Sequence, residues 1–416
     1  MANNWGTQSL VAKEILFQFS QVGKVARNCD FRTEEFKPDN NAGQSRSFRR
    51  PTINDVTQTT PAAVGAVAGA PTYTDLREPM VPLSIEQKFV SNFQIGIDDL
   101  ATQLTREQAI ERHIKPTVAR MGRMIDRYIA SKAIRYAGQV IGNPAAPATG
   151  DTLLGNLAAA QALFNARGRE DDGDSVIITP EGVATTLQQA NLKLFNPGNQ
   201  ISEIYKKGLM GQFANFDFYR SPLLPSDNVS VIPTVAGAVN GAGQGLTAWA
   251  QTCTLAVTGI TVAGNVIKAG TKFKIAGVNW CNPDTKDDTG IQAVFSVIND
   301  ATLTGGAGTL TISEPIVISG PHQNVFAGPA NSAALTWVSV VSGSQPSLAF
   351  SRKAIICASP KLNLPKKIEF SEQEEINGIN IAIIESFDPY NFNKIFSIQA
   401  LIGAAAYLPE HIATVY

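Results

Sequence analysis

Residues that could support catalysis or metal binding are few and scattered along this chain. The three histidines, His113, His322 and His411, lie in separate segments, with no HExxH motif and no Cys/His ligand spacing. The stretch CNPDTKDDTG gathers Asp284, Asp287 and Asp288, but its spacing does not match a calcium-binding EF-hand loop. We interpret these aspartates as part of a solvated contact loop, with a calcium site as the less favoured alternative.

Motifs for nucleotide binding and nucleophilic catalysis are incomplete. The glycine-rich VNGAGQGL follows no convincing strand and lacks the Lys-Ser/Thr of a phosphate-binding loop. Ser175 is not part of a GxSxG elbow, and no histidine follows it at a spacing typical of a catalytic triad. We therefore predict no catalytic residue, no metal and no cofactor, and the sequence favours an architectural protein over an enzyme.

Arginines in the stretch SRSFRRP are the strongest candidates for binding. Arg46, Arg49 and Arg50 carry guanidinium groups, which pair bidentately with carboxylates and also with phosphates. Residues 1–50 contain eight Lys/Arg and five Asp/Glu, a net charge of +3. A solvated loop, salt bridges between subunits and contact with DNA all remain open. We take Arg46, Arg49 and Arg50, together with Asp284, Asp287 and Asp288, as candidate contacts between subunits.

Length and composition indicate a globular protein with more than one domain. The chain has 416 residues, 44% of them hydrophobic, which suggests two or three cores. Its formal net charge of −1 does not indicate a general nucleic-acid binder. The sequence start lacks signal-peptide features, and we expect the four widely spaced cysteines to be reduced thiols. Apolar runs are too short for a membrane span.

Periodicity predicts the elements that would position these residues. Apolar residues at helical spacing predict a long helix over 117–137, and a shorter amphipathic helix is expected within the first 35 residues. Segments 80–89 and 92–97 have strand character, and we expect a long hairpin loop before the long helix. A mixed α and β region follows at 151–225. Asn377-Gly378 predicts a two-residue hairpin turn, and the C-terminal residues are expected to form one long strand with a tail.

Arginine is absent between Arg220 and Arg352, and the composition changes over this interval. Short strand candidates alternate there with turns rich in Gly, Asn and Asp, which is typical of a small all-β barrel or sandwich. We interpret the interval as a β module inserted into a mixed α and β host.

Particular stretches of the sequence resemble the major capsid proteins of tailed bacteriophages, and most closely the coat protein family of Salmonella short-tailed phages. Within the inserted module they are GNVIKAGTKFKIAGVNW (264–280), AVFSVIN (293–299) and TLTISEPIV (309–317). Outside it they are IDDL (97–100), FDFYRSPLLP (216–225), LAFSRKAIICASPKL (348–362) and ALIGAAAYLPEHIA (400–413).

This resemblance implies an α+β fold of the Hong Kong 97 type with an inserted small β-barrel domain. The implied parts are an N-terminal arm (1–35), an extended loop with adjoining strands (36–100), the spine helix of a peripheral domain (101–140), the first part of an axial domain (141–225), the inserted domain (226–347), the axial return (348–360) and C-terminal strands (361–416).

The implied function is self-assembly into an icosahedral shell around a double-stranded DNA phage genome, without sequence-specific DNA binding. Hexamers and pentamers of this chain, a scaffolding protein and a portal are the implied partners. Assembly would take place in the host bacterial cytoplasm, through a procapsid that expands on packaging. The alternatives are an encapsulin-like compartment shell and a host- or carbohydrate-binding module.

Overall fold

The computed structural model describes residues 23–36, 45–51, 78–96, 115–145, 151–168, 174–184, 212–213, 215–226, 232–338, 344–364 and 370–416. The amphipathic helix expected near the N-terminus, most of the predicted extended loop and His113 lie outside these residues. None of the described helices combines the length and apolarity of a membrane span.

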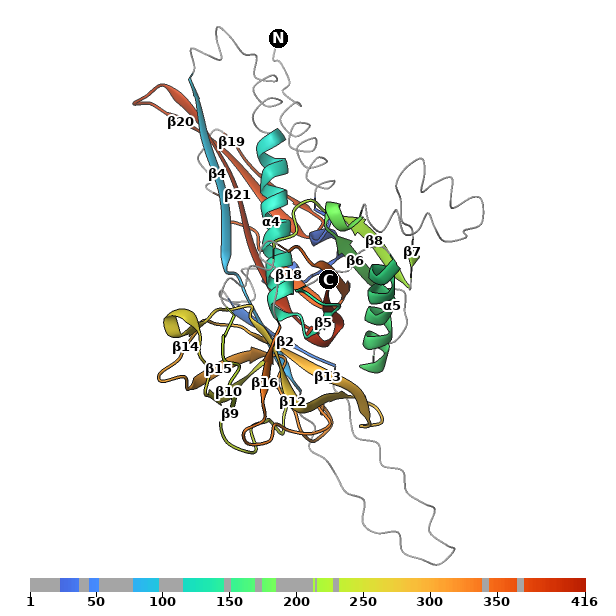
Figure 1. Ribbon diagram of the computed structural model, residues 1–416. Helices are drawn as coiled ribbons and strands as arrows, with labels where there is room; N and C mark the ends of the chain where they lie inside the picture. Colours follow the sequence, from blue (N-terminus) through green and yellow to red (C-terminus); the bar gives the residue numbers. More distant parts are fainter. Residues whose placement is uncertain are drawn as a thin grey trace, which may run out of the picture.

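The central element is α4 (Lys115–Tyr136), which confirms the long helix predicted over 117–137. Its buried face is formed by residues at helical spacing, among them Val118, Met121, Ile125 and Ile129. Figure 1 shows α4 lying along a tall sheet on one side, with a second sheet beside its lower half. The helix therefore connects the cores of both sheets.

The tall sheet has the order β1-β18-β21-β20-β19, and β4 also pairs with β21. Its strands are β1 (Asp30–Phe31), β4 (Gln87–Gly96), β18 (Ile355–Ala358), β19 (Phe370–Ile376), β20 (Ile379–Asp388) and β21 (Asn393–Ala406). Asn377 and Gly378 both have positive φ, 48° and 78°, between β19 and β20. The predicted two-residue hairpin turn is confirmed, because such turns require positive φ at both central residues.

The second sheet has the order β5-β22-β17-β6-β8-β7. Its strands are β5 (Gln139–Ile141), β6 (Ser175–Thr179), β7 (Gln212–Phe213), β8 (Phe216–Arg220), β17 (Ser347–Ser351) and β22 (Ile412–Val415), and α5 (Asp151–Ala166) packs against them. The C-terminus differs from the single strand with a tail that the sequence suggested. Helix η6 (Pro409–His411) turns the chain after β21, and the supposed tail forms β22 in this second sheet.

Residues 232–338, which we call the β unit, form a third sheet of order β16-β12-β13-β15-β10-β9. Its strands are β9 (Ala238–Val239), β10 (Thr252–Thr258), β12 (Lys272–Cys281), β13 (Asp288–Val297), β15 (Gly308–Ser313) and β16 (Leu335–Trp337). Short strands β11 (Val266–Ile267) and β14 (Ala301–Thr302) pair separately. The N–H of Val239 donates to the Ala333 carbonyl at 3.0 Å, which joins the two ends of the sheet. The unit has its own buried core, including Phe273, Phe295 and Trp280.

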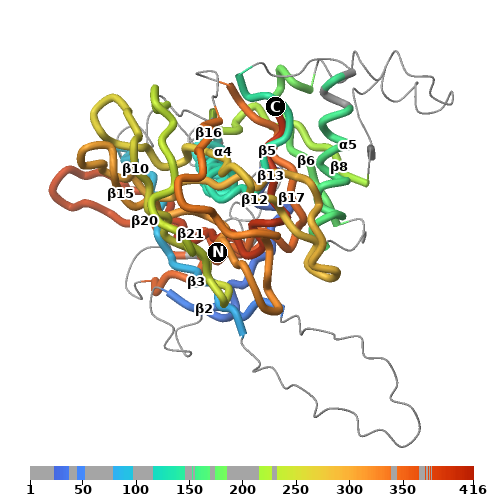
Figure 2. Tube along the Cα trace, turned by 60° about the horizontal axis from the view of Figure 1, so that its bottom comes forward, coloured from blue at the N-terminus to red at the C-terminus, as the bar shows by residue number. Residues whose placement is uncertain are grey.

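The chain leaves the second sheet after β8 and returns to it at β17, so the β unit lies between two strands of one host sheet. In the turned view of Figure 2, β12 and β13 lie toward β5 and β17, whereas β10 and β15 lie on the far side. A separate hairpin, β2 (Ser45–Arg49) with β3 (Met80–Ser84), packs Phe48, Val81 and Leu83 against the end of β18 and β21. The host and the β unit meet near the end of this hairpin.

Candidate functional site

The three candidate arginines lie on or just after β2, but the structure gives them different environments. Arg46 donates to the carbonyl oxygen of Glu35 at 2.6 Å and pairs with the Glu35 carboxylate at 3.3 Å. Arg49 pairs with Glu78 at 3.0 Å, and 70% of its side chain is exposed. Side chains alternate along a strand, so neighbouring arginines point in different directions. Arg49 is therefore the arginine of this group that is most available to another molecule.

Arg50 is held inside the chain, at the contact between the β2–β3 hairpin, the C-terminal segment and the β unit. Its guanidinium pairs with the Glu410 carboxylate, and only 10% of its side chain is exposed. The ring of Trp249, from the β unit, lies 4.1 Å from its guanidinium carbon, within the range of a cation–π contact. Burial alone would raise the pKa of Glu410, but Arg50, His411 and Arg167 outweigh it and lower that pKa. Glu410 is thus held as a carboxylate.

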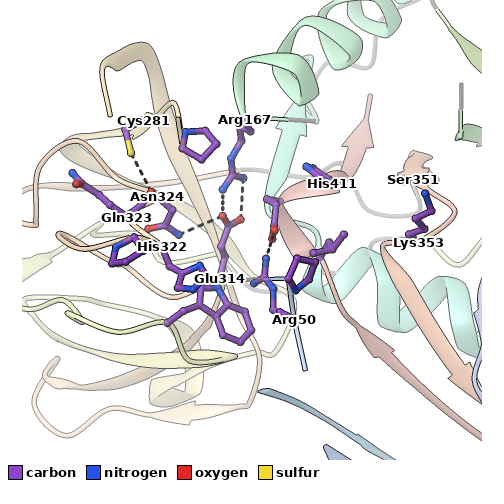
Figure 3. Close-up of a pocket in the computed structure, with 17 residues that line it drawn as sticks. Arg50, Arg167, Cys281, Glu314, His322, Gln323, Asn324, Ser351, Lys353 and His411 are labelled. Atoms are coloured by element: carbon purple, nitrogen blue, oxygen red, sulfur yellow. Dashed lines mark hydrogen bonds and ion pairs between the residues drawn. The ribbon is translucent and has the colours of Figure 1, made fainter. Parts of the chain in front are cut away.

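A second buried pair, Arg167 with Glu314, joins the host to the β unit. Arg167 follows α5, Glu314 follows β15, and their side chains are 4% and 2% exposed. The guanidinium donates to both carboxylate oxygens, with Nη1 at 3.1 Å from Oε2, and lies 3.9 Å from the centre of the Trp280 ring. Burial lowers the pKa of Arg167 to about 10, so it remains charged at neutral pH. Figure 3 shows Arg167 and Glu314 pointing directly at one another.

The backbone at this contact is also constrained, at Glu314 and at Gly138. Glu314 has φ of 57°, which places a non-glycine residue in the left-handed region. Gly138, just beyond α4, lies against the Glu314 carboxylate, since a Cβ at Gly138 would come within 2.0 Å of its Oε2. Gly138 therefore gives the buried carboxylate the space that it occupies.

Lys272 provides another buried polar contact between the β unit and the host. It is 1% exposed, and its Nζ donates to Thr414 Oγ1 on β22 at 3.0 Å. The same amine lies 5.9 Å from the centre of the Tyr416 ring. The cationic groups at this contact thus come from Arg50, Arg167 and Lys272. Arg167 and Lys272 each bind a group on the other side of the contact. Arg50 pairs with Glu410 of the C-terminal segment and lies over Trp249 of the β unit. We call these three residues, with Glu314, Glu410, Trp249 and Trp280, the interdomain contact.

A cavity of about 430 Å³ opens beside the interdomain contact. Its lining includes His322 and His411, which come from the β unit and η6, and also Lys353 and the two ion pairs (Figure 3). Among the described residues, no group of three or more His, Cys, Asp or Glu side chains could hold a metal ion. The two carboxylates that face the cavity already pair with arginines.

The acidic loop between β12 and β13 is exposed at Asp284 and Asp287, and Asp288, the first residue of β13, is exposed beside it. Asp288 accepts a hydrogen bond from Asn279 at 3.0 Å and one from the Gly290 N–H at 2.8 Å. The base of the loop touches the host, because a Cβ at Gly168 would lie 2.4 Å from Pro283. The loop is therefore anchored at its base and presents carboxylates to solvent.

Sequence reasoning identified Arg50 but missed Arg167, Lys272, Glu314 and Glu410. A signal for one of them was present, since Glu314 is a single acidic residue within the apolar run TISEPIV. Charged residues are seldom fully buried without a partner, so an isolated acid in a strand-like run predicts a buried ion pair. Its partner, Arg167, is 147 positions away, and the sequence contains no local indication of that pairing.

Comparison with known proteins gives one match over nearly the whole chain. The model of the family described as P22 coat protein, gene protein 5, matches residues 1–414. No curated protein matches the chain.

Several solved structures that resemble this one come from phages. A protein of Mycobacterium phage Che8 is 10% identical, with TM-score 0.49 and coverage of 94% of this chain and 90% of that one. A capsid protein of cyanophage P-SCSP1u is 11% identical, with TM-score 0.47 and coverage of 94% and 86%. A capsid protein of Ralstonia phage GP4 is 9% identical, with TM-score 0.45 and coverage of 92% and 84%.

Proposed function

Because this chain belongs to the P22 coat protein family and is the major capsid protein of a tailed phage, we propose that exposed groups on the host and on the β unit join its copies into an icosahedral shell. It is a structural protein of the virion.

The observation that carries the proposal is an exposed aromatic cluster at the far end of the tall sheet. Phe387, Tyr390 and Phe392 lie at the turn between β20 and β21, where their exposed fractions are 38%, 94% and 68%. Phe387 and Phe392 pack edge to face, with ring centroids 6.1 Å apart. Exposed clusters of large apolar side chains mark protein interaction sites, and aromatic residues are enriched at the centres of interfaces. We propose that this cluster contacts another copy of the chain.

Charged contacts between copies are proposed at Arg46, Arg49 and the acidic loop. Arg49 is the most favourable of these, since its ion pair with Glu78 is exposed and can be exchanged for a partner on a neighbour. Asp284, Asp287 and Asp288 are exposed acidic groups that complement such arginines. The sequence also suggested Arg50 as a contact between copies, but its guanidinium pairs with Glu410 of the same chain. We therefore leave it out of the proposed charged contacts.

We further propose that residues 226–347 form an inserted β-barrel domain and that the remaining parts are divided as the sequence suggested. Support comes from the separate core of the β unit and from the hydrogen bonds that join the ends of its sheet. We also propose that the chain forms hexameric and pentameric capsomers and that a scaffolding protein and a portal are its partners. Assembly takes place in the bacterial cytoplasm, and the shell expands on packaging. A net charge of −1 suits a container that encloses double-stranded DNA without gripping it.

Electron microscopy with light scattering on the full-length chain, expressed alone and with its scaffolding protein, tests the proposal. Closed shells, or aberrant assemblies that the scaffold corrects, are the expected result. A monodisperse monomer or dimer under both conditions would contradict assembly by this chain. Replacing Tyr390 and Phe392 by serine should reduce shell yield at least tenfold while the subunit remains folded.

A further inference from the structure

Positive charge is concentrated on helix α4. The helix contains six Lys or Arg residues and one acidic residue, a net charge of +5, whereas the whole chain has a net charge of −1. The acidic residue is Asp126, which is 3% exposed and accepts hydrogen bonds from the backbone N–H groups of Lys24, Val25 and Ala26. Its carboxylate is therefore enclosed by the N-terminal segment, and the charged residues that α4 exposes are all basic.

Three of these basic residues, Arg120, Arg123 and Arg127, lie in a row on the exposed side of α4, and we call them the arginine row. At about 100° per residue, they lie roughly opposite Val118 and Ile125, which belong to the buried core beneath the helix. Spacings of three and four positions make them neighbours on the helix surface. With a rise of about 1.5 Å per residue, the row is about 10 Å long.

The charges of the arginine row have no internal counter-charge in the part of the chain that the structure describes. No side-chain hydrogen bond or ion pair joins any of the three guanidinium groups to another described residue. Other exposed cations do pair, as Arg49 does with Glu78 and Lys268 with Asp300. Like charges three or four positions apart on a helix repel one another, so an anionic partner would relieve this repulsion.

We propose that the arginine row binds the phosphate backbone of double-stranded DNA without reading its sequence. This rests on the proposed function, in which the shell encloses such DNA. Each guanidinium fork can donate two hydrogen bonds to one phosphate. Phosphates of one strand follow one another at about 3.4 Å along the duplex axis, so a row of about 10 Å matches about three of them.

The composition of α4 favours DNA over an acidic protein as the partner. Centres of protein interfaces are apolar and rich in aromatic residues, whereas Met124 is the one large apolar residue that α4 exposes among its described side chains. The helix contains no Asn or Gln that would read adenine edges, which fits contact with the backbone alone. About three phosphate contacts per copy are weak at physiological salt, so each copy would hold DNA only loosely.

Fluorescence anisotropy of a labelled duplex of about 30 base pairs, titrated with the full-length subunit at several salt concentrations, tests the proposal. Replacing Arg120, Arg123 and Arg127 together by Gln should weaken binding at about 50 mM salt at least tenfold. The slope of log affinity against log salt should become shallower by about 2–3, since each phosphate contact contributes about 0.9. Two duplexes of unrelated sequence should bind equally well. Absence of binding by the unaltered chain, or an unchanged slope in the variant, would overturn the proposal.

A matched variant separates the arginine row from net charge. Arg27, Lys88 and Lys361 are exposed cations outside α4, and their joint replacement by Gln removes the same charge. This control should bind DNA nearly as the unaltered chain does, whereas equal losses in both triple variants would overturn the proposal. All six side chains are exposed, so both variants should unfold at the temperature of the unaltered chain. If the row variant does not fold, single replacements by Gln should each lower the slope by about 1.

Two further measurements separate the partner and the function. Displacement of the duplex by polyglutamate at equal charge concentration would indicate an acidic protein as the partner and would overturn the proposal. Electron microscopy on the same preparations scores shell formation independently of DNA binding. Closed shells from a chain that does not bind the duplex would contradict the arginine row and leave the shell function intact. Binding through the row by a chain that forms no shells would support the row and contradict the shell function.

Discussion

At the scale of single residues, the interdomain contact holds two ion pairs whose side chains are largely or almost wholly buried. Arg167 and Glu314 are both almost inaccessible, so each depends on the other to offset the loss of hydration. A buried ion pair of this kind contributes little net stability compared with apolar packing, but removal of one partner leaves an uncompensated charge. The pair therefore fixes where the β unit lies on the host more than it strengthens the fold.

Replacement of either partner tests this interpretation. Arg167→Met or Glu314→Gln should each lower the free energy of unfolding by about 3–5 kcal/mol, because each leaves a buried charge unpaired. The double variant should lose clearly less than the sum of the single losses. Urea unfolding of the monomer followed by tryptophan fluorescence measures all three. Lys268→Met, which breaks an exposed pair with Asp300, is the matched control and should change stability little.

Gly138 and Gly155 give a paired test of close packing. Gly138→Ala should destabilise the subunit by about 1–3 kcal/mol, because the new methyl group would overlap the Glu314 carboxylate and approach the Pro409 carbonyl oxygen at 3.0 Å. Gly155→Ala, within α5, should stabilise it by about 0.5–1 kcal/mol, since nothing lies within 4 Å of the added Cβ. Thermal unfolding of both variants measures the effects. Equal changes in the two variants would contradict the packing at Gly138.

At the scale of elements, the β unit has a core that is separate from the host core. The chain enters and leaves it from β8 and β17, and its buried apolar residues pack with one another. The β unit, which has no arginine, meets arginines of the host at the interdomain contact. The β unit supplies Trp249, Trp280 and Glu314 to the interdomain contact, and the host supplies the guanidinium groups of Arg50 and Arg167.

The separate core of the β unit predicts that this unit can fold without the host, whereas the host is poorly soluble without the β unit. A fragment of residues 226–347 should fold alone and unfold cooperatively, because its core does not depend on the host. The chain that lacks these residues should be poorly soluble, since Arg167 and Thr414 lose their partners. Circular dichroism during thermal unfolding, with sedimentation of the deletion variant, measures both outcomes. A fragment without cooperative unfolding would show that its core needs the host.

At the scale of the whole molecule, the proposed assembly uses groups that the single subunit leaves exposed. Arg49→Asp should reduce shell formation about tenfold or more without loss of subunit stability, because 70% of its side chain is exposed. Arg50→Asp should instead reduce the stability of the monomer, because it places a carboxylate against buried Glu410. Electron microscopy scores the shells, and thermal unfolding scores the monomers. Normal shells from Arg49→Asp would remove this residue from the proposed interface.

Sequence patterns were sufficient to predict the fold class, the long helix, the hairpin turn at Asn377-Gly378 and the family. The α+β fold of the Hong Kong 97 type is confirmed, and the protein is a major capsid protein. These features could be predicted because each depends on local periodicity, on turn chemistry or on stretches of matching residues. The six candidate contact residues stay predictions, and the structure places Arg50 in an internal pair.

The pairing of charges that lie far apart in the sequence could be seen only in the folded chain. Glu314 lies 147 positions from Arg167, Arg50 lies 360 positions from Glu410, and Asp126 lies about 100 positions from the backbone that it holds. Pairings of this kind depend on how separate cores pack, and no local pattern encodes them. The C-terminal tail is a similar case. It forms β22 because β17 and β5 of the second sheet pair with it on its two sides. Burial made these contacts obligatory, since a charge or a backbone group removed from water must find its partner within the fold.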